Sequence, residues 1–195
     1  MVVFTGVMSY KPNDDAALYF GEVILPLIRK SLPEMQFWIV GKDPGPEVLA
    51  LAQRPGIHVT GGVPDVRPYV HKAGVFVSPL RYGTGIKNKL LAALAMEKAV
   101  VATSHTTEGL EVRDGQDLLV ADDPADFAAK VIRLIEDAPF ARQLAQSGQA
   151  FVRERYAWET SARSLEETLL RVVKQHPSQS TMNPASMHGT ISTSR

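Results

Sequence analysis

The sequence predicts an α/β fold built on a mainly parallel sheet. Short apolar segments of strand length alternate with segments whose apolar residues recur at helical spacing. The strand segments are continuous apolar runs, which is typical of strands covered by helices on both faces. Helices between consecutive strands indicate right-handed βαβ connections, and no repeat of fixed period is visible.

The first part of the chain provides the predicted sheet. Strands are expected at 2–7, 35–41, 57–61, 75–80, 99–104 and 117–121, and the helices between them at 13–31, 46–53, 66–73 and from about Ile86. Asn13 or Asp14 can cap the first helix, because a side-chain oxygen accepts from the free N–H groups of a first turn. Pro26 is expected to kink that helix.

Helices dominate the sequence after Asp122. The pattern predicts three, at 123–137, 139–156 and 158–175, and the first has Asp122 or Asp123 as its cap and Pro124 in its first turn. Residues 176–195 are rich in Ser, Thr and Pro and have few large aliphatic side chains, so we expect a disordered tail. The predicted organisation is one domain over 1–175 followed by that tail.

Composition excludes several classes of protein. The 195 residues include 21 basic and 21 acidic ones, which argues against a nucleic-acid partner. There is no cysteine, and the five histidines show no metal-ligand spacing, so we expect neither a disulfide nor a metal. No apolar run has transmembrane length and no signal peptide is recognised, so a cytoplasmic location is expected.

A glycine-rich segment, RYGTGIKNK, joins the strand at 75–80 to the next helix. The first turn of a helix has unpaired N–H groups and a partial positive charge, which together attract phosphate. Gly83 and Gly85 let an anion approach the backbone, Thr84 offers a hydroxyl, and Arg81, Lys87 and Lys89 add positive charge. The alternative is a flexible loop with solvated lysines.

Several blocks in order resemble the C-terminal, donor-binding half of GT-B-type family 4 glycosyltransferases. They include FTGVMSYKPNDDA, VTGGVPDVRPYV, VFVSPLRYGTGIKNKLLAALAMEKAVVATSHTTEGL and RERYAWETSARSLEETL, and together they cover about residues 2–172. The resemblance implies a Rossmann-like half of a two-domain enzyme that transfers a sugar with retention from a UDP- or GDP-linked donor, without a further cofactor. An acceptor domain would be missing or supplied by another chain, so the isolated chain is expected to be weak or inactive.

The resemblance also implies the roles of individual residues, although it leaves the catalytic residue unknown. The donor diphosphate would lie against Gly83, Thr84, Gly85, Ile86 and Lys87. The nucleobase and ribose would lie near Val63, Pro64, Asp65 and Ala92. Further contacts with the cleft are expected from Gly6, Lys11, Thr107 and Glu108.

Two departures from the family pattern bear on function. Ala92 stands where the family carries a glutamate that accepts from ribose hydroxyls, and losing such a charged acceptor costs about 1.5–3 kcal/mol. Glu97 stands where the family has glycine. The alternative function is therefore a non-catalytic, degenerate donor domain that acts as a binding module. A receiver-like signalling domain is disfavoured because the first strand ends in FTGVMSY, without acidic residues.

Overall fold

The computed structural model describes residues 1–84, 88–156 and 166, and the first of its two compact units is Met1–Tyr156. Within that unit six parallel strands form one sheet in the order β3-β2-β1-β4-β5-β6. Their bounds are β1 Val2–Thr5, β2 Phe37–Val40, β3 Ile57–Val59, β4 Val75–Ser78, β5 Val100–Ala102 and β6 Leu119–Val120. This order is that of a Rossmann-like sheet, so the predicted fold class is confirmed. The predicted domain end at residue 175 stays a prediction.

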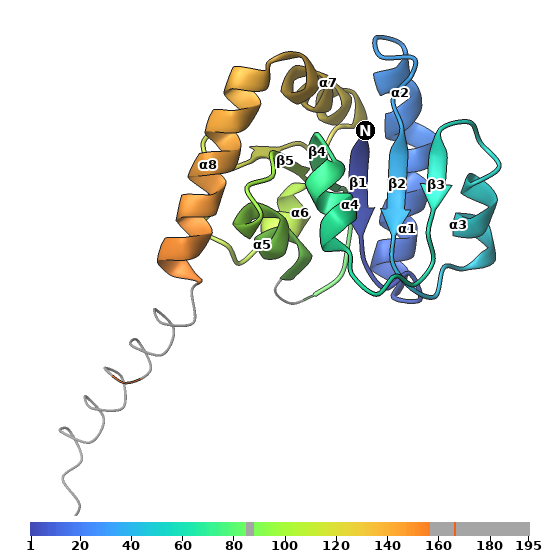
Figure 1. Cartoon of the computed structure of the whole chain (residues 1–195), viewed down its shortest axis with the longest axis horizontal. Coiled ribbons are helices and arrows are strands. Elements are labelled where there is room, and N and C mark those ends of the chain that lie inside the picture. The colour runs from blue at the N-terminus through green and yellow to red at the C-terminus, as the bar shows by residue number, and fades with distance from the viewer. Residues whose placement is uncertain (85–87, 157–165, 167–195) are drawn as a thin grey trace, which may run out of the picture. The chain divides into compact units, whose positions relative to one another are not determined.

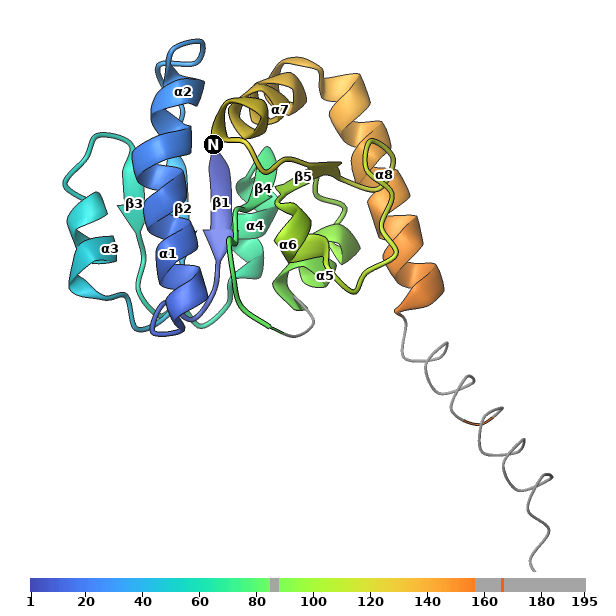
Figure 2. The same ribbon diagram turned by 180° about the vertical axis from the view of Figure 1, so that it is seen from behind.

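The strands are buried on both faces, as their continuous apolar runs predict. In β1, Val2 and Phe4 join one core cluster while Val3 joins the other, because successive side chains point to opposite faces. The first cluster packs against the helices from Lys11 to Arg29, α3 (Pro46–Leu51) and α7 (Pro124–Glu136). The second packs against α4 (Arg67–Lys72), α5 (Asn88–Ala95) and the end of α8 (Ala138–Arg155). Figure 1 shows α4 and α5 in front of the sheet. Figure 2, the view from the opposite side, shows α1, α2 and α7 in front of it.

The first helix begins earlier than predicted and is distorted before Pro26. It begins at Lys11 and not after Asn13, so the predicted cap at Asn13 or Asp14 is wrong, and both residues lie buried in the first turn. The helix runs as α1 (Lys11–Tyr19), a π-helical turn (Phe20–Ile24) and α2 (Leu25–Arg29). Pro26 lacks an N–H and would clash with the carbonyl one turn earlier, and a wider turn directly before it relieves both problems.

Asp122 and Asp123 accept hydrogen bonds at the starts of two different helices. The carboxylate of Asp123 accepts from the N–H groups of Ala125 and Asp126 at 2.8 and 3.0 Å and so caps α7, as predicted. Asp122 accepts instead from the N–H of Ser104 at 2.8 Å, at the start of the short helix α6 (Ser104–Thr107). The predicted helix at 158–175 and the predicted tail at 176–195 fall outside the described residues, apart from residue 166.

Because all six strands are parallel, their carboxyl ends lie along one edge of the sheet. The arrowheads of β1, β2 and β3 point to the lower edge of Figure 1, where the chain also enters α5 from β4. In open α/β sheets ligands bind outside this edge, where the strand order reverses. Here the reversal lies between β1 and β4. No helix within the described ranges has the length and apolar character to cross a membrane.

Candidate nucleotide-binding site

An open hollow of about 500 Å³ lies at the carboxyl ends of β1 and β2 and is called here the apolar hollow. Its lining comes from the loops after β1, β2 and β3 and from the first turns of α5. The lining residues are Thr5, Gly6, Val7, Val40, Gly41, Lys42, Gly62, Val63, Val66, Asn88, Lys89 and Ala92. Valine side chains form much of its wall, and two lysines supply its charge.

A smaller hollow of about 220 Å³, called here the loop hollow, lies beside the first one. Its lining is Tyr10, Pro12, Asn13, Leu80, Tyr82, Thr84, Asn88 and Lys89. Asn88 and Lys89 line both hollows, so the start of α5 separates the two and faces each. A ligand with an apolar, flat end and an anionic end can use both.

Lys89 is held where the two hollows meet. The buried amide of Asn13 donates to the carbonyl of Val7 at 2.8 Å, and its oxygen accepts from the Lys89 ammonium. The same ammonium lies 4.6 Å from the centroid of the Phe4 ring, close enough for a cation–π contact. Asn13 and Phe4 together fix the ammonium of Lys89 at the junction.

Two glycines allow the backbone to form the floor of the apolar hollow. A Cβ on Gly6 would lie 2.7 Å from the Asn13 amide nitrogen and 3.2 Å from the Lys89 ammonium. At Gly41, where φ is 154°, a Cβ would lie 1.7 Å from the carbonyl oxygen of Gly6. The structure thus places Gly6 in the hollow, next to the residues that hold Lys89.

The glycine-rich segment is described up to Thr84. Gly83 has a φ of 113°, and a Cβ there would lie 2.9 Å from Pro12. Its carbonyl is 2.6 Å from Nε2 of His105, and since a carbonyl only accepts, this nitrogen carries the proton. Thr84 lines the loop hollow. Gly85, Ile86 and Lys87, the other residues predicted against the diphosphate, lie outside the described residues.

Of the four residues predicted near the nucleobase and ribose, Val63 and Ala92 line the apolar hollow, whereas Pro64 and Asp65 are not part of its lining. The Asp65 carboxylate accepts from Nε of Arg67 at 2.9 and 3.0 Å and from the backbone N–H of Arg67 at 2.9 Å. The side-chain hydrogen bond with Arg67, followed by the backbone one, holds the pKa of Asp65 below its usual value.

The remaining predicted contacts lie outside both linings. Lys11 is exposed, with its ammonium 3.6 Å from Asp14. Thr107 donates its hydroxyl to the carbonyl of Ser104 at 2.9 Å, and the exposed Glu108 lies 3.5 Å from Nδ1 of His105.

Arg81, expected to add positive charge, donates from Nε to Asp15 at 3.0 Å and stacks over Tyr19, 4.5 Å from the ring centroid. Its contacts thus join the loop after β4 to the first helix.

Sequence reasoning missed most of the apolar wall and the role of Asn13. Val7 is the last residue of the first predicted strand, and Lys42 and Gly62 come directly after the second and third. Because parallel strands end at the same edge, that shared position was a usable signal. Asn13 carried no such signal, since its partner Lys89 lies 76 positions away in the chain.

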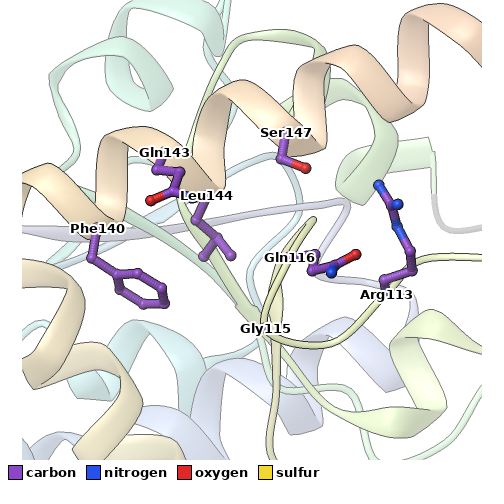
Figure 3. Close-up of a pocket in the computed structure, with 7 residues that line it drawn as sticks. All are labelled: Arg113, Gly115, Gln116, Phe140, Gln143, Leu144 and Ser147. Carbon is purple, nitrogen blue, oxygen red and sulfur yellow. The ribbon is translucent and has the colours of Figure 1, made fainter.

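A third hollow, of about 240 Å³, lies at the β6 edge of the sheet. Figure 3 shows Phe140, Gln143, Leu144 and Ser147 of α8 facing the loop that carries Arg113, Gly115 and Gln116. Arg113 is the one charged residue in this lining, and its guanidinium is held by the buried Asp117 at 2.8 Å. An anion would have to compete with that carboxylate, so this hollow is the poorer candidate. In the described part of the chain no group of three or more His, Asp or Glu is placed to hold a metal ion.

The model of the family described as "Glycosyl transferases group 1" matches residues 1–137, which include every residue of the two hollows. The chain belongs to this family. A relative from Klebsiella pneumoniae, an uncharacterized 44.6 kDa protein in the cps region, is 23% identical over 163 residues, or 80% of this chain and 42% of the relative. An uncharacterized glycosyltransferase of Methanocaldococcus jannaschii is 25% identical over 122 residues, or 60% of this chain and 31% of the relative. This group 1 chain therefore spans less than half the length of either relative.

Several solved structures share the fold. Anabaena HepE in complex with UDP has a TM-score of 0.71 at 16% identity, with 87% of this chain and 48% of that chain covered. The C-terminal domain of a group 1 family protein, LpcC from Francisella tularensis, has a TM-score of 0.63 at 16% identity, with 80% and 86% covered. At these identities the likeness concerns the Rossmann-like half alone.

Proposed function

We propose that this chain is the donor-binding half of a glycosyltransferase and binds a UDP- or GDP-linked sugar across the two hollows. The observation that carries the proposal is the fixed ammonium of Lys89 at their junction. On one side it faces the loop hollow with Thr84, which suits the diphosphate. On the other side it faces a hollow of about 500 Å³ with valine walls, which suits a nucleoside.

The proposed reaction moves a glycosyl group. The bond between the anomeric carbon and the β-phosphate oxygen breaks, and a new bond forms between that carbon and an acceptor hydroxyl oxygen. The nucleoside diphosphate leaves with the electron pair of the broken bond, and its leaving phosphate oxygen takes the proton of the acceptor hydroxyl. Lys89 stabilises the negative charge that develops on the leaving diphosphate, and the family resemblance favours retention at the anomeric carbon.

Transfer also requires a place for the acceptor. The two hollows are open, and group transfer depends on excluding water and positioning both substrates. We propose that a second, acceptor-binding part completes the cleft, in keeping with the greater length of the curated relatives. The isolated chain would then bind a nucleotide but transfer sugar slowly or not at all.

One observation favours a second candidate, a binding module without catalysis. Ala92 lines the apolar hollow, and no carboxylate is present in the described part of that lining. A site that has lost a charged acceptor can lose affinity for the donor by about tenfold to a hundredfold. Such a domain could still pair with an acceptor-binding chain.

Calorimetric titration with UDP and with GDP separates these candidates. Binding of either nucleotide at micromolar concentration supports a live donor site, and no binding at millimolar concentration favours the degenerate module. Lys89→Met should weaken binding at least about tenfold, because a hydrogen bond to a charged group contributes roughly 1.5–3 kcal/mol. The matched control is Lys30→Met, an exposed lysine just after α2 and outside both linings, which should leave affinity unchanged. Equal affinities for all three proteins would contradict the assignment of Lys89.

A further inference from the structure

We infer that this site does not select ribose over deoxyribose: it takes nucleoside diphosphates of both sugar series. The inference rests on the proposed function, because it assumes that a nucleotide occupies the two hollows. It concerns the chemistry that surrounds the pentose and is carried by Ala92 and by the lining around it.

The position of Lys89 orients the ligand. The diphosphate is the charged part of a nucleotide and belongs beside the fixed ammonium, between the hollows. The nucleoside then extends into the apolar hollow, where Val7 and Val66 are 39% and 38% exposed and offer open apolar surface. The pentose joins these two parts, so it lies next to the start of α5.

Ala92 is the residue of α5 that faces this position. It lies three and four residues after Lys89 and Asn88, and residues at those spacings share one face of a helix. It is exposed and lines the apolar hollow with both of them. Its methyl group can neither accept nor donate a hydrogen bond, so α5 offers the pentose hydroxyls no acceptor here.

Three carboxylates near the hollows, one in the loop after β3 and two on α1, are already engaged. Asp65 accepts from Arg67 through both of its oxygens, Asp15 accepts from Arg81, and Asp14 is buried near Lys11. The neutral polar side chains in the described lining are those of Thr5 and Asn88. A neutral group gives a weaker hydrogen bond than a carboxylate does.

The lining determines how strongly the site discriminates between nucleotides with and without the pentose hydroxyls. A site built to hydrogen-bond a substrate hydroxyl rejects the analogue that lacks it, because its own polar group is left unpaired. The described lining has no charged acceptor, and the exposed Lys42 can return its ammonium to water when a hydroxyl is missing. Removing the pentose hydroxyls should therefore change affinity by less than about tenfold. Ala92→Glu supplies a charged acceptor. It should raise the ratio of the dissociation constant of the deoxy form to that of the ribose form by at least about a further tenfold.

The test compares pairs of nucleotides on the full chain by calorimetry. The probes are UDP, GDP and their 2′-deoxy and 2′,3′-dideoxy forms, and the proteins are the natural chain, Ala92→Glu and Ala95→Glu. The matched control is Ala95, because it is exposed on the same helix but lies outside both linings. We expect the deoxy forms to bind less than tenfold more weakly than UDP or GDP to the natural chain and to Ala95→Glu. For Ala92→Glu we expect a larger difference.

Two negative results have different meanings. If UDP or GDP binds and its deoxy forms bind more than tenfold more weakly to the natural chain, the inference is wrong and the proposed function stands. If Ala92→Glu gives the same ratio as Ala95→Glu, the pentose does not lie beside residue 92 and the inference is equally wrong. If none of the probes binds at millimolar concentration, the proposed function fails and the inference fails with it.

Discussion

At one residue of this chain, Glu97, the backbone conformation is unfavourable for the side chain that is present. Glu97, just past the end of α5, has a φ of 55°, in the left-handed region that favours glycine. Its N–H donates to the carbonyl of Leu94 at 2.9 Å, and the N–H of Lys98 donates to Ala93 at 3.1 Å, as at a helix end that closes with a left-handed residue. The sequence comparison with the family located this position, because the family has glycine there.

Glu97→Gly should therefore stabilise the protein. Removing the side chain relieves the left-handed strain, and the greater freedom of glycine in the unfolded chain offsets part of the gain. We expect an increase of about 0.5–1 kcal/mol in the free energy of unfolding, measured by urea denaturation. Glu97→Ala keeps the strain and should not reproduce the gain. A destabilised Glu97→Gly variant would show that the carboxylate makes a contact of greater value.

Helices and strands were predicted where the pattern within one segment decides them. The six strands follow from their apolar runs, and α7 follows from its cap at Asp123 and its proline. The start of α1 was misplaced because the oxygen of Asn13 was assigned to a local cap. Its real partner, Lys89, comes from another element, and the pattern within one segment contains no information about such a contact.

The contact of α8 with α5 and with the loop before β6 depends on Gly148. A Cβ there would lie 2.4 Å from the carbonyl oxygen of Asp117 and 2.7 Å from Cδ2 of Leu94. Helix propensity alone predicts that Gly148→Ala stabilises by about 1 kcal/mol, whereas overpacking predicts a loss of about 1–3 kcal/mol. We expect the loss of stability, measured as a lower melting temperature of Gly148→Ala than of the natural chain. Gln146→Ala, at an exposed position of the same helix, is the control and should change stability little.

Asp117 ties the loop before β6 to α8 and should make stability depend on pH. Burial acts to raise the pKa of this carboxyl, but hydrogen bonds from the side chain and backbone of Arg113 and from Ser147 outweigh it, so the pKa is lowered. A lowered pKa gives stability that is present above the unfolded value of about 3.9 and is lost as the pH falls through the folded value.

Asp117→Asn removes this contribution. We expect a loss of about 1–3 kcal/mol at pH 7, since the buried group loses part of its hydrogen bonding, and a smaller difference from the natural chain below about pH 4. Urea denaturation at both pH values measures it. Asp126→Asn, in an exposed pair with Lys130, is the control. A difference that does not change with pH would contradict the ionised state of Asp117.

At the scale of the whole molecule, the strand order brings together residues that are distant in the sequence. The loops after β1, β2 and β3 and the start of α5 meet only because β1 lies between β2 and β4. Sequence reasoning located Gly6, Val63, Thr84 and Ala92 through the family resemblance. It could not locate the valine wall or the Asn13–Lys89 contact, because these depend on packing between elements.

The position of each hollow in the whole fold indicates which one is functional. The hollows at the carboxyl ends of β1, β2 and β4 share the fixed ammonium of Lys89 and include a valine wall, whereas the hollow beside α8 has one charged lining residue, Arg113, which is held by the buried carboxylate of Asp117. We therefore expect a nucleoside diphosphate to bind at the carboxyl ends of these strands and not beside β6.

Amide chemical-shift mapping by NMR tests that claim most directly. With UDP or GDP added, we expect the largest shifts on the N–H groups of Gly6, Gly62, Asn88 and Ala92. Shifts concentrated on Gly115, Gln116 and Ser147, or no shifts at millimolar nucleotide, would contradict it.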